Sequence, residues 1–142
     1  MKSSVMSGEN TVLQAEGALR EEHRELEQLM GLLEEANDLS ALVSSADELR
    51  QALTLHFAHE EHPGGLYDSL KICVPEHRRE LAQLVEDHRQ MGAALWQLYR
   101  RARELDARFQ ELRTEVARWV AALREHERRE HDLAKRAVGV SG

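Results

Sequence analysis

The chain has little of what interrupts helices or cross-links secreted domains: among 142 residues there are 8 glycines, 2 prolines and 1 cysteine. So little glycine and proline favours long helices. The single cysteine, Cys73, excludes an internal disulfide and predicts a reducing, cytoplasmic location. No segment approaches the roughly 18 apolar residues that cross a bilayer. Residues 1–11 are rich in serine and lack the apolar core of a signal peptide, so we expect a flexible tail there and no membrane partner.

The chain also has fewer basic residues than acidic ones. Lys and Arg number 19 against 26 Asp and Glu, which gives a formal net charge of −7. A protein that binds nucleic acid needs a basic surface to contact the phosphates, so we expect no nucleic-acid partner. The length suits one domain with a core of its own.

Apolar residues recur instead with the three- and four-residue spacing of helices that pack in a bundle. Four such stretches cover residues 12–33, 42–63, 81–102 and 109–137. Breaks between them are expected at 37–40, at 72–76 around Pro75, and near 104–108, the last with no glycine or proline. We predict an all-α, antiparallel up-down-up-down four-helix bundle over residues 12–138, with tails at 1–11 and 139–142.

The second predicted helix contains its own interruption, Pro63-Gly64-Gly65. Proline and glycine must bend or end a helix there, and residues 66–74 are expected to form a short further helical piece. The interruption comes directly after a candidate metal ligand, Glu60. It either opens the site to solvent or simply ends the helix.

One motif occurs twice on the apolar faces of the predicted helices: a lone histidine and, farther along the chain, a His-x-x-x-Glu. The six residues are His23, His56, Glu60, His88, His126 and Glu130. The spacing within each pair places His and Glu on one helical face, one turn apart. Each predicted helix carries one group of these ligands, and the residues midway between one group and the next fall near the three expected breaks. In an antiparallel bundle, all six candidate ligands would therefore lie at the same height. A buried, unpaired glutamate costs several kcal/mol, whereas imidazole and carboxylate together suit iron, manganese or zinc.

These residues and their neighbours resemble the hemerythrin-like (HHE cation-binding) family, whose ligand order is His, His-x-x-x-Glu, His, His-x-x-x-Glu. The resemblance spans roughly residues 12–137 and is carried by EHREL at 22–26, HFAHEE at 56–61, EDHRQM at 86–91 and EHERRE at 125–130. It implies a bundle that holds two iron ions, with the four histidines as terminal ligands. Glu60 and Glu130 would bridge the ions beside an oxo or hydroxo group. Manganese and zinc are the lesser alternatives.

The resemblance implies a protein that binds or senses dioxygen, nitric oxide or peroxide, or that serves iron homeostasis or iron-centre repair, with its output passing to an unidentified protein partner. Oxygen-carrying hemerythrins have a further histidine one turn from the third-helix ligand. Here Leu84 and Gly92 flank His88 at that spacing, so oxygen transport is not expected. The alternatives are an oxidase or peroxidase-like di-iron enzyme, a class richer in carboxylates, and a structural bundle that holds zinc.

Other residues near these motifs carry weaker expectations. His59 is interpreted as a boundary residue or as a hydrogen-bond partner of a ligand. Those expected to face solvent or to point away from the site are His62, His77, His131, Glu61 and Glu127. Core packing is expected of Trp96, Phe109 and Trp119.

Overall fold

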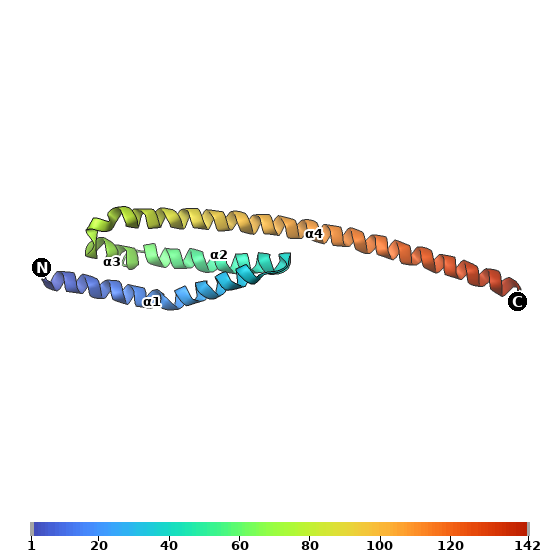
Figure 1. Cartoon of the computed structure of the whole chain (residues 1–142), viewed down its shortest axis with the longest axis horizontal. Coiled ribbons are helices and arrows are strands. Elements are labelled where there is room, and N and C mark those ends of the chain that lie inside the picture. The colour runs from blue at the N-terminus through green and yellow to red at the C-terminus, as the bar shows by residue number, and fades with distance from the viewer. Residues whose placement is uncertain (1, 142) are drawn as a thin grey trace. The chain divides into compact units, whose positions relative to one another are not determined.

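The computed structural model describes residues 2–141, which form helices joined by short connections (Figure 1). The helices are α1 (Lys2–Glu35), α2 (Leu39–Glu61), α3 (Leu66–Cys73) and α4 (Arg78–Ser141), with a 3-10 turn, η1 (Pro75–His77), before α4. No strand occurs within residues 2–141, so the predicted all-α class is confirmed. In this described part of the chain, no helix is both long and apolar enough to cross a membrane.

Two of the three expected breaks between helices are confirmed. Between α1 and α2, the Asp38 carboxylate accepts a hydrogen bond of 2.7 Å from the backbone N–H of Ala41. This side-chain cap satisfies a backbone donor that the first turn of a helix leaves free. Between α3 and α4, Pro75 is at the start of η1, where its fixed φ suits the first turn of a helix.

The interruption at Pro63-Gly64-Gly65 is also confirmed, because α2 ends at Glu61 and the short helix α3 follows. Gly64 has a φ of +82°, a conformation that glycine adopts without steric cost. A Cβ atom on Gly65 would lie 2.5 Å from the carbonyl oxygen of His59. Both glycines are therefore needed where the chain leaves α2 and starts α3.

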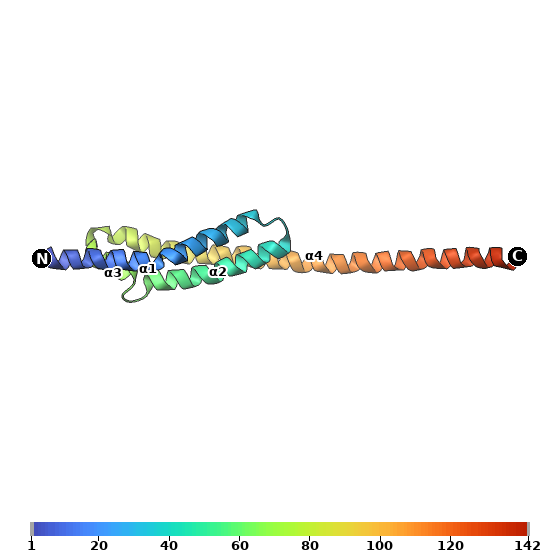
Figure 2. The same cartoon turned by 90° about the horizontal axis from the view of Figure 1, so that it is seen from below.

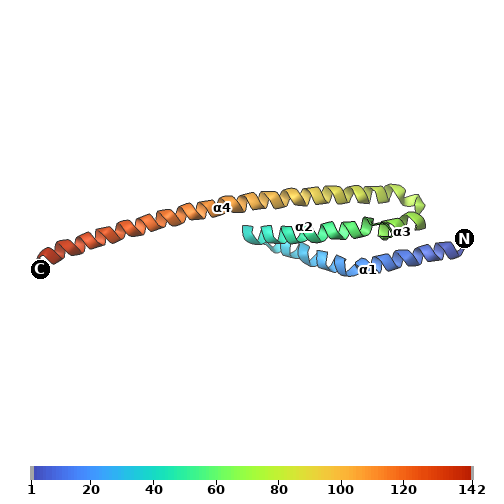
Figure 3. The same cartoon turned by 180° about the vertical axis from the view of Figure 1, so that it is seen from behind.

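The chain divides into two compact units, Met1–Arg103 and Glu104–Gly142. In the first unit, α1, α2, α3 and the N-terminal part of α4 lie alongside one another, as the two perpendicular views show (Figures 1 and 2). The same group of helices is seen from behind in Figure 3. Its buried core includes Leu26 of α1, Leu49 of α2 and Leu95 of α4. Each of the three long helices thus turns part of its apolar stripe toward the others.

The turn predicted near 104–108 is wrong, because α4 is helical throughout this stretch. Residues 103–108 are Arg, Glu, Leu, Asp, Ala and Arg, mostly good helix formers with no glycine or proline among them. One helix therefore stands where a third and a fourth helix were predicted, and the antiparallel order of four helices is not confirmed. Helix also extends into both segments expected to be tails, since α1 begins at Lys2 and α4 ends at Ser141.

The second unit is the C-terminal part of α4, and its apolar stripe is exposed. The exposed side chains of this stripe are Phe109, Leu112, Val116, Trp119, Leu123 and Leu133. A single helix cannot bury its own apolar face, so the core packing expected of Phe109 and Trp119 does not occur within this unit. In the first unit Trp96 is also 42% exposed, with the Arg50 guanidinium 5.0 Å from its ring centroid.

Candidate metal centre

Histidines from α1 and α2 meet a glutamate of α2 in the first unit. The Nε2 atoms of His23 and His56 are 3.1 Å apart, and the His56 Nε2 atom is 3.2 Å from the Glu60 Oε1 atom. One ligand atom from each of these three residues lies within 4.8 Å of the other two. His56 and Glu60 are buried, while His23 is exposed. Two imidazoles and a carboxylate at this separation can share one ion.

Helix α4 brings a third imidazole to the same glutamate. The His88 Nε2 atom lies 3.4 Å from the Glu60 Oε1 atom, and the His88 ring stacks on Phe57 with centroids 3.7 Å apart. The Glu60 carboxylate therefore lies between an imidazole of α2 and an imidazole of α4. A carboxylate has two oxygens with several lone pairs, so this position suits a group shared by two ions.

The burial of Glu60 itself favours a cation. Only 8% of Glu60 is exposed, and its ion-pair partners in the described chain are the imidazoles of His56 and His88. A buried carboxylate is costly unless positive charge or hydrogen bonds compensate it. A metal ion held by nitrogen and oxygen donors would supply that charge, so the residues present fit a metal centre.

Two further carboxylates contact the histidines on their other nitrogen. The His56 Nδ1 atom is 2.9 Å from Glu22 Oε1, and the His88 Nδ1 atom is 3.1 Å from Glu61 Oε2. A carboxylate accepts a hydrogen bond from Nδ1–H, which fixes the ring and leaves Nε2 to bind metal. The expectation that Glu61 points away from the site is therefore wrong: at the end of α2, its side chain reaches across to α4.

Glu22 was not singled out from the sequence, although it directly precedes His23. Its second oxygen is 2.6 Å from the Nδ1 atom of His59. Burial would raise the pKa of Glu22, but the hydrogen bonds from His56 and His59 and their positive charge outweigh burial and hold that pKa below its usual range. The His59 side chain is 47% exposed. His59 therefore lies at the boundary between the site and solvent, and it contacts Glu22, the carboxylate partner of the candidate ligand His56.

Tyr67 of α3 also reaches the site and was missed. Its hydroxyl lies 2.8 Å from the His88 Nε2 atom, and the side chain is buried. Burial raises the pKa of the Tyr67 phenol above its usual range, and the negative charges of Glu60, Glu61 and Asp87 raise it further. The available sequence signal was its position two residues after Gly65, where the interrupted helix resumes.

The other predicted ligand pair belongs to the second unit. There the His126 Nε2 atom and the Glu130 Oε1 atom form an ion pair one helical turn apart, with side chains 59% and 67% exposed. The structure thus brings His23, His56, Glu60 and His88 together in the first unit, and it holds the other two as a pair in the second. The remaining histidines, His62, His77 and His131, are exposed as expected.

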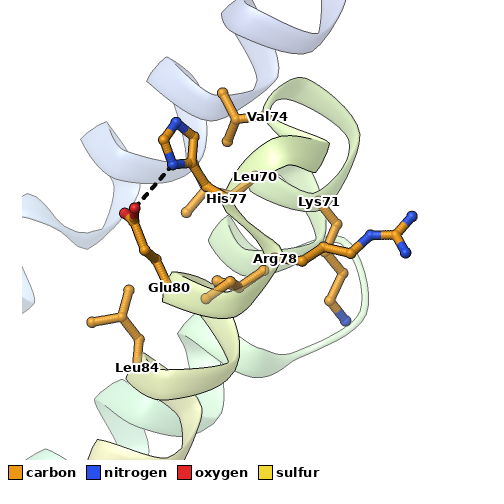
Figure 4. Close-up of a pocket in the computed structure, with 8 residues that line it drawn as sticks. Leu70, Lys71, Val74, His77, Arg78, Glu80 and Leu84 are labelled. Carbon is orange, nitrogen blue, oxygen red and sulfur yellow. Dashed lines mark hydrogen bonds and ion pairs between the residues drawn. The ribbon is translucent and has the colours of Figure 1, made fainter.

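One cavity borders the candidate centre, and another lies apart from its ligands. One lies at the α2–α3 interruption, and its walls include Glu22, His59 and residues 63–65. The interruption therefore borders a cavity that reaches the carboxylate partner of His56. The other lies between α3 and the start of α4 (Figure 4). Leu70, Val74 and Leu84 make its walls largely apolar, and none of the six predicted ligands lines it.

Helices α1, α2 and α4 bring three histidines and a buried glutamate to one place. This arrangement defines an all-α metal-binding domain. The family model described as the hemerythrin HHE cation-binding domain matches residues 15–138, which is most of the chain. The protein therefore belongs to the hemerythrin HHE cation-binding family, and its domain is a metal-binding one. Comparisons with curated proteins and with solved structures give no significant match.

The contact between Glu22 and His56 leads to a first prediction. Replacing Glu22 with Ala is expected to lower metal affinity about 10–100-fold, because His56 loses the group that orients its ring. Competition with a chelator measures this change, and thermal unfolding of the metal-free variant shows whether the fold is intact. The matched control is Glu21→Ala, because Glu21 is exposed and its one ion-pair partner among the described residues is Arg24. Equal affinities in the two variants would show that Glu22 does not orient a ligand.

Proposed function

We propose that this protein is a non-haem di-iron protein whose reduced centre binds nitric oxide or dioxygen, in a sensing, iron-homeostasis or iron-centre repair role. The proposed ligands of the first unit are His23, His56, Glu60 and His88, and the family resemblance adds His126 and Glu130 of the second unit. The observation that supports this most strongly is the Glu60 carboxylate, which lies within 3.4 Å of the Nε2 atoms of both His56 and His88. That is where a carboxylate bridging two ions would lie. The family match includes both proposed ligands of the second unit.

Each residue around the centre has a distinct part in this proposal. His23, His56 and His88 would supply nitrogen donors, and Glu60 would supply negative charge to both ions. Glu22 and Glu61 hold two of the imidazole rings in place through Nδ1. Phe57 covers one face of the His88 ring. Bound ferrous iron would supply open coordination positions for a small diatomic ligand.

The surroundings of His88 favour ligand binding over reversible oxygen transport. Gly92 lies one turn after His88 and offers no side-chain donor. A Cβ atom built at Gly92 meets nothing within 4 Å, so this side of α4 leaves room near the ligand. We place the protein in a reducing, cytoplasmic setting, which the lone Cys73 supports.

Metal analysis of protein made in iron-replete cells tests this proposal. We expect two iron ions per chain and near-ultraviolet absorption from an oxo bridge in the oxidised form. The double variant His126→Ala/Glu130→Ala should lose iron, because the proposed centre loses a terminal ligand and a bridge. The matched control from the same helix, Glu127→Ala/His131→Ala, should keep the parent content. One metal per chain, zinc alone, or equal iron in the two double variants would overturn the six-ligand centre.

A further inference from the structure

We infer that Tyr67 is a seventh protein ligand, which binds through its phenol oxygen to the metal ion held by His88. This inference rests on the proposed function, since it assigns one more donor to the same centre. The two tyrosines of the chain are Tyr67 and Tyr99. Tyr67 is the one placed at the candidate centre, on the short helix that follows the Pro63-Gly64-Gly65 interruption.

The distance between donor atoms fits two ligands of one ion. The Tyr67 hydroxyl oxygen and the His88 Nε2 atom are 2.8 Å apart. Nitrogen and oxygen donors lie about 2.0–2.2 Å from a transition-metal ion, so two donors at right angles around it are about 3 Å apart. The Nε2 atoms of His23 and His56 show a similar separation, 3.1 Å. Glu60 therefore stands between two donor pairs, His23 with His56 and His88 with Tyr67.

The hydrogen bonds around His88 indicate which nitrogen of its ring would face the ion. Where His88 Nδ1–H donates to Glu61, the Nε2 atom accepts a hydrogen bond from the Tyr67 hydroxyl. An ion bound at Nε2 would take the place of that hydrogen. The Tyr67 oxygen would then be left beside the ion in a buried position, where a polar atom needs a partner. The phenol O–H bond would break, an iron–oxygen bond would form, and the proton would pass to solvent.

The residues one helical turn from His88 offer no metal-binding side chain, so Tyr67 would supply a donor that α4 lacks. Neither neighbour of His88 at one-turn spacing, Leu84 or Gly92, can bind metal through its side chain. Tyr67 supplies a donor from a different helix, and the turn at Gly64 and Gly65 is what carries α3 into position. Tyrosine is an established ligand of iron in proteins, and its hard oxygen favours the ferric state.

The spectrum of the ferric protein tests this inference. A phenolate bound to ferric iron absorbs in the visible region by charge transfer, and resonance Raman excitation in that band shows tyrosine vibrations. We expect both signals in the parent and their complete loss in Tyr67→Phe, which keeps the ring that stacks on His88. The matched control is Tyr99→Phe, because the Tyr99 ring lies 5.4 Å from the Arg50 guanidinium. This control should keep the full visible band.

Other outcomes separate this inference from the proposed function. Parent protein with two irons and no visible phenolate band would overturn the Tyr67 ligand and leave the di-iron centre standing. A visible band that survives in Tyr67→Phe would overturn it as well. Parent protein that binds no iron would overturn the proposed function, and the inference with it. Thermal unfolding of metal-free Tyr67→Phe at the parent temperature would show that any lost band reflects ligation and not misfolding.

Discussion

Replacing Glu60 with Ala is expected to remove iron from both positions of the centre. The Glu60 oxygen lies near the Nε2 atoms of His56 and His88, so one substitution would take a donor from both ions of the proposed centre. The loss of affinity should exceed the about 10–100-fold cost of losing a group that only orients a ligand. Metal content after dialysis and chelator competition measure the effect. Glu48→Ala is the control, because Glu48 is an exposed glutamate of the same helix.

The stability of metal-free protein gives this prediction a second readout. A buried carboxylate that only imidazoles accompany is costly, so metal-free Glu60→Ala should unfold at the parent's denaturant concentration or above it. A purely structural role for Glu60 predicts the opposite, a less stable metal-free protein. If the variant keeps both irons, or if Glu48→Ala loses as much metal, Glu60 is not a bridge.

Mixing the reduced protein with dioxygen is expected to give the ferric protein rapidly, without reversible uptake. The first unit offers few nitrogen donors around His88, and the open space beside Gly92 leaves room for water. Both features favour oxidation over release of dioxygen. Nitric oxide should bind the reduced protein readily, because ferrous iron in the proposed centre would have open coordination positions. Stopped-flow absorption measures the rate of oxidation, and infrared spectroscopy detects the bound nitric oxide.

Substitution at Gly92 tests the structural reason for this behaviour. Gly92→His should slow the oxidation about tenfold, or about 1.4 kcal/mol in the barrier, if the new ring reaches the ion. Gly92→Ala is the control that fills part of the space without adding a donor, and the open surroundings of Gly92 accept its Cβ. Parent protein that holds dioxygen for hours and releases it under vacuum would restore oxygen transport as the function.

Much of the fold and of the candidate site followed from local sequence signals. Helical spacing and scarce glycine predicted the all-α class, and Pro63, Gly64 and Gly65 predicted the end of α2. The His-x-x-x-Glu motifs predicted the family, which the match over residues 15–138 confirms. The uninterrupted course of α4 through 104–108 was not predicted, because the gap between two apolar stretches and the symmetry of the ligand positions both indicated a break there. The residues at 104–108 themselves favour helix.

Sequence periodicity by itself determined which residues share a helical face, because the helix repeats every 3.6 residues whatever surrounds it. It therefore placed His56 with Glu60, and His126 with Glu130. Only the tertiary structure decided which side chains meet across helices, because those distances depend on how α1, α2, α3 and α4 pack. Glu22 on His56, Glu61 on His88 and Tyr67 at the His88 Nε2 atom are contacts of this kind. Each joins residues too far apart in the chain for any local pattern to relate them.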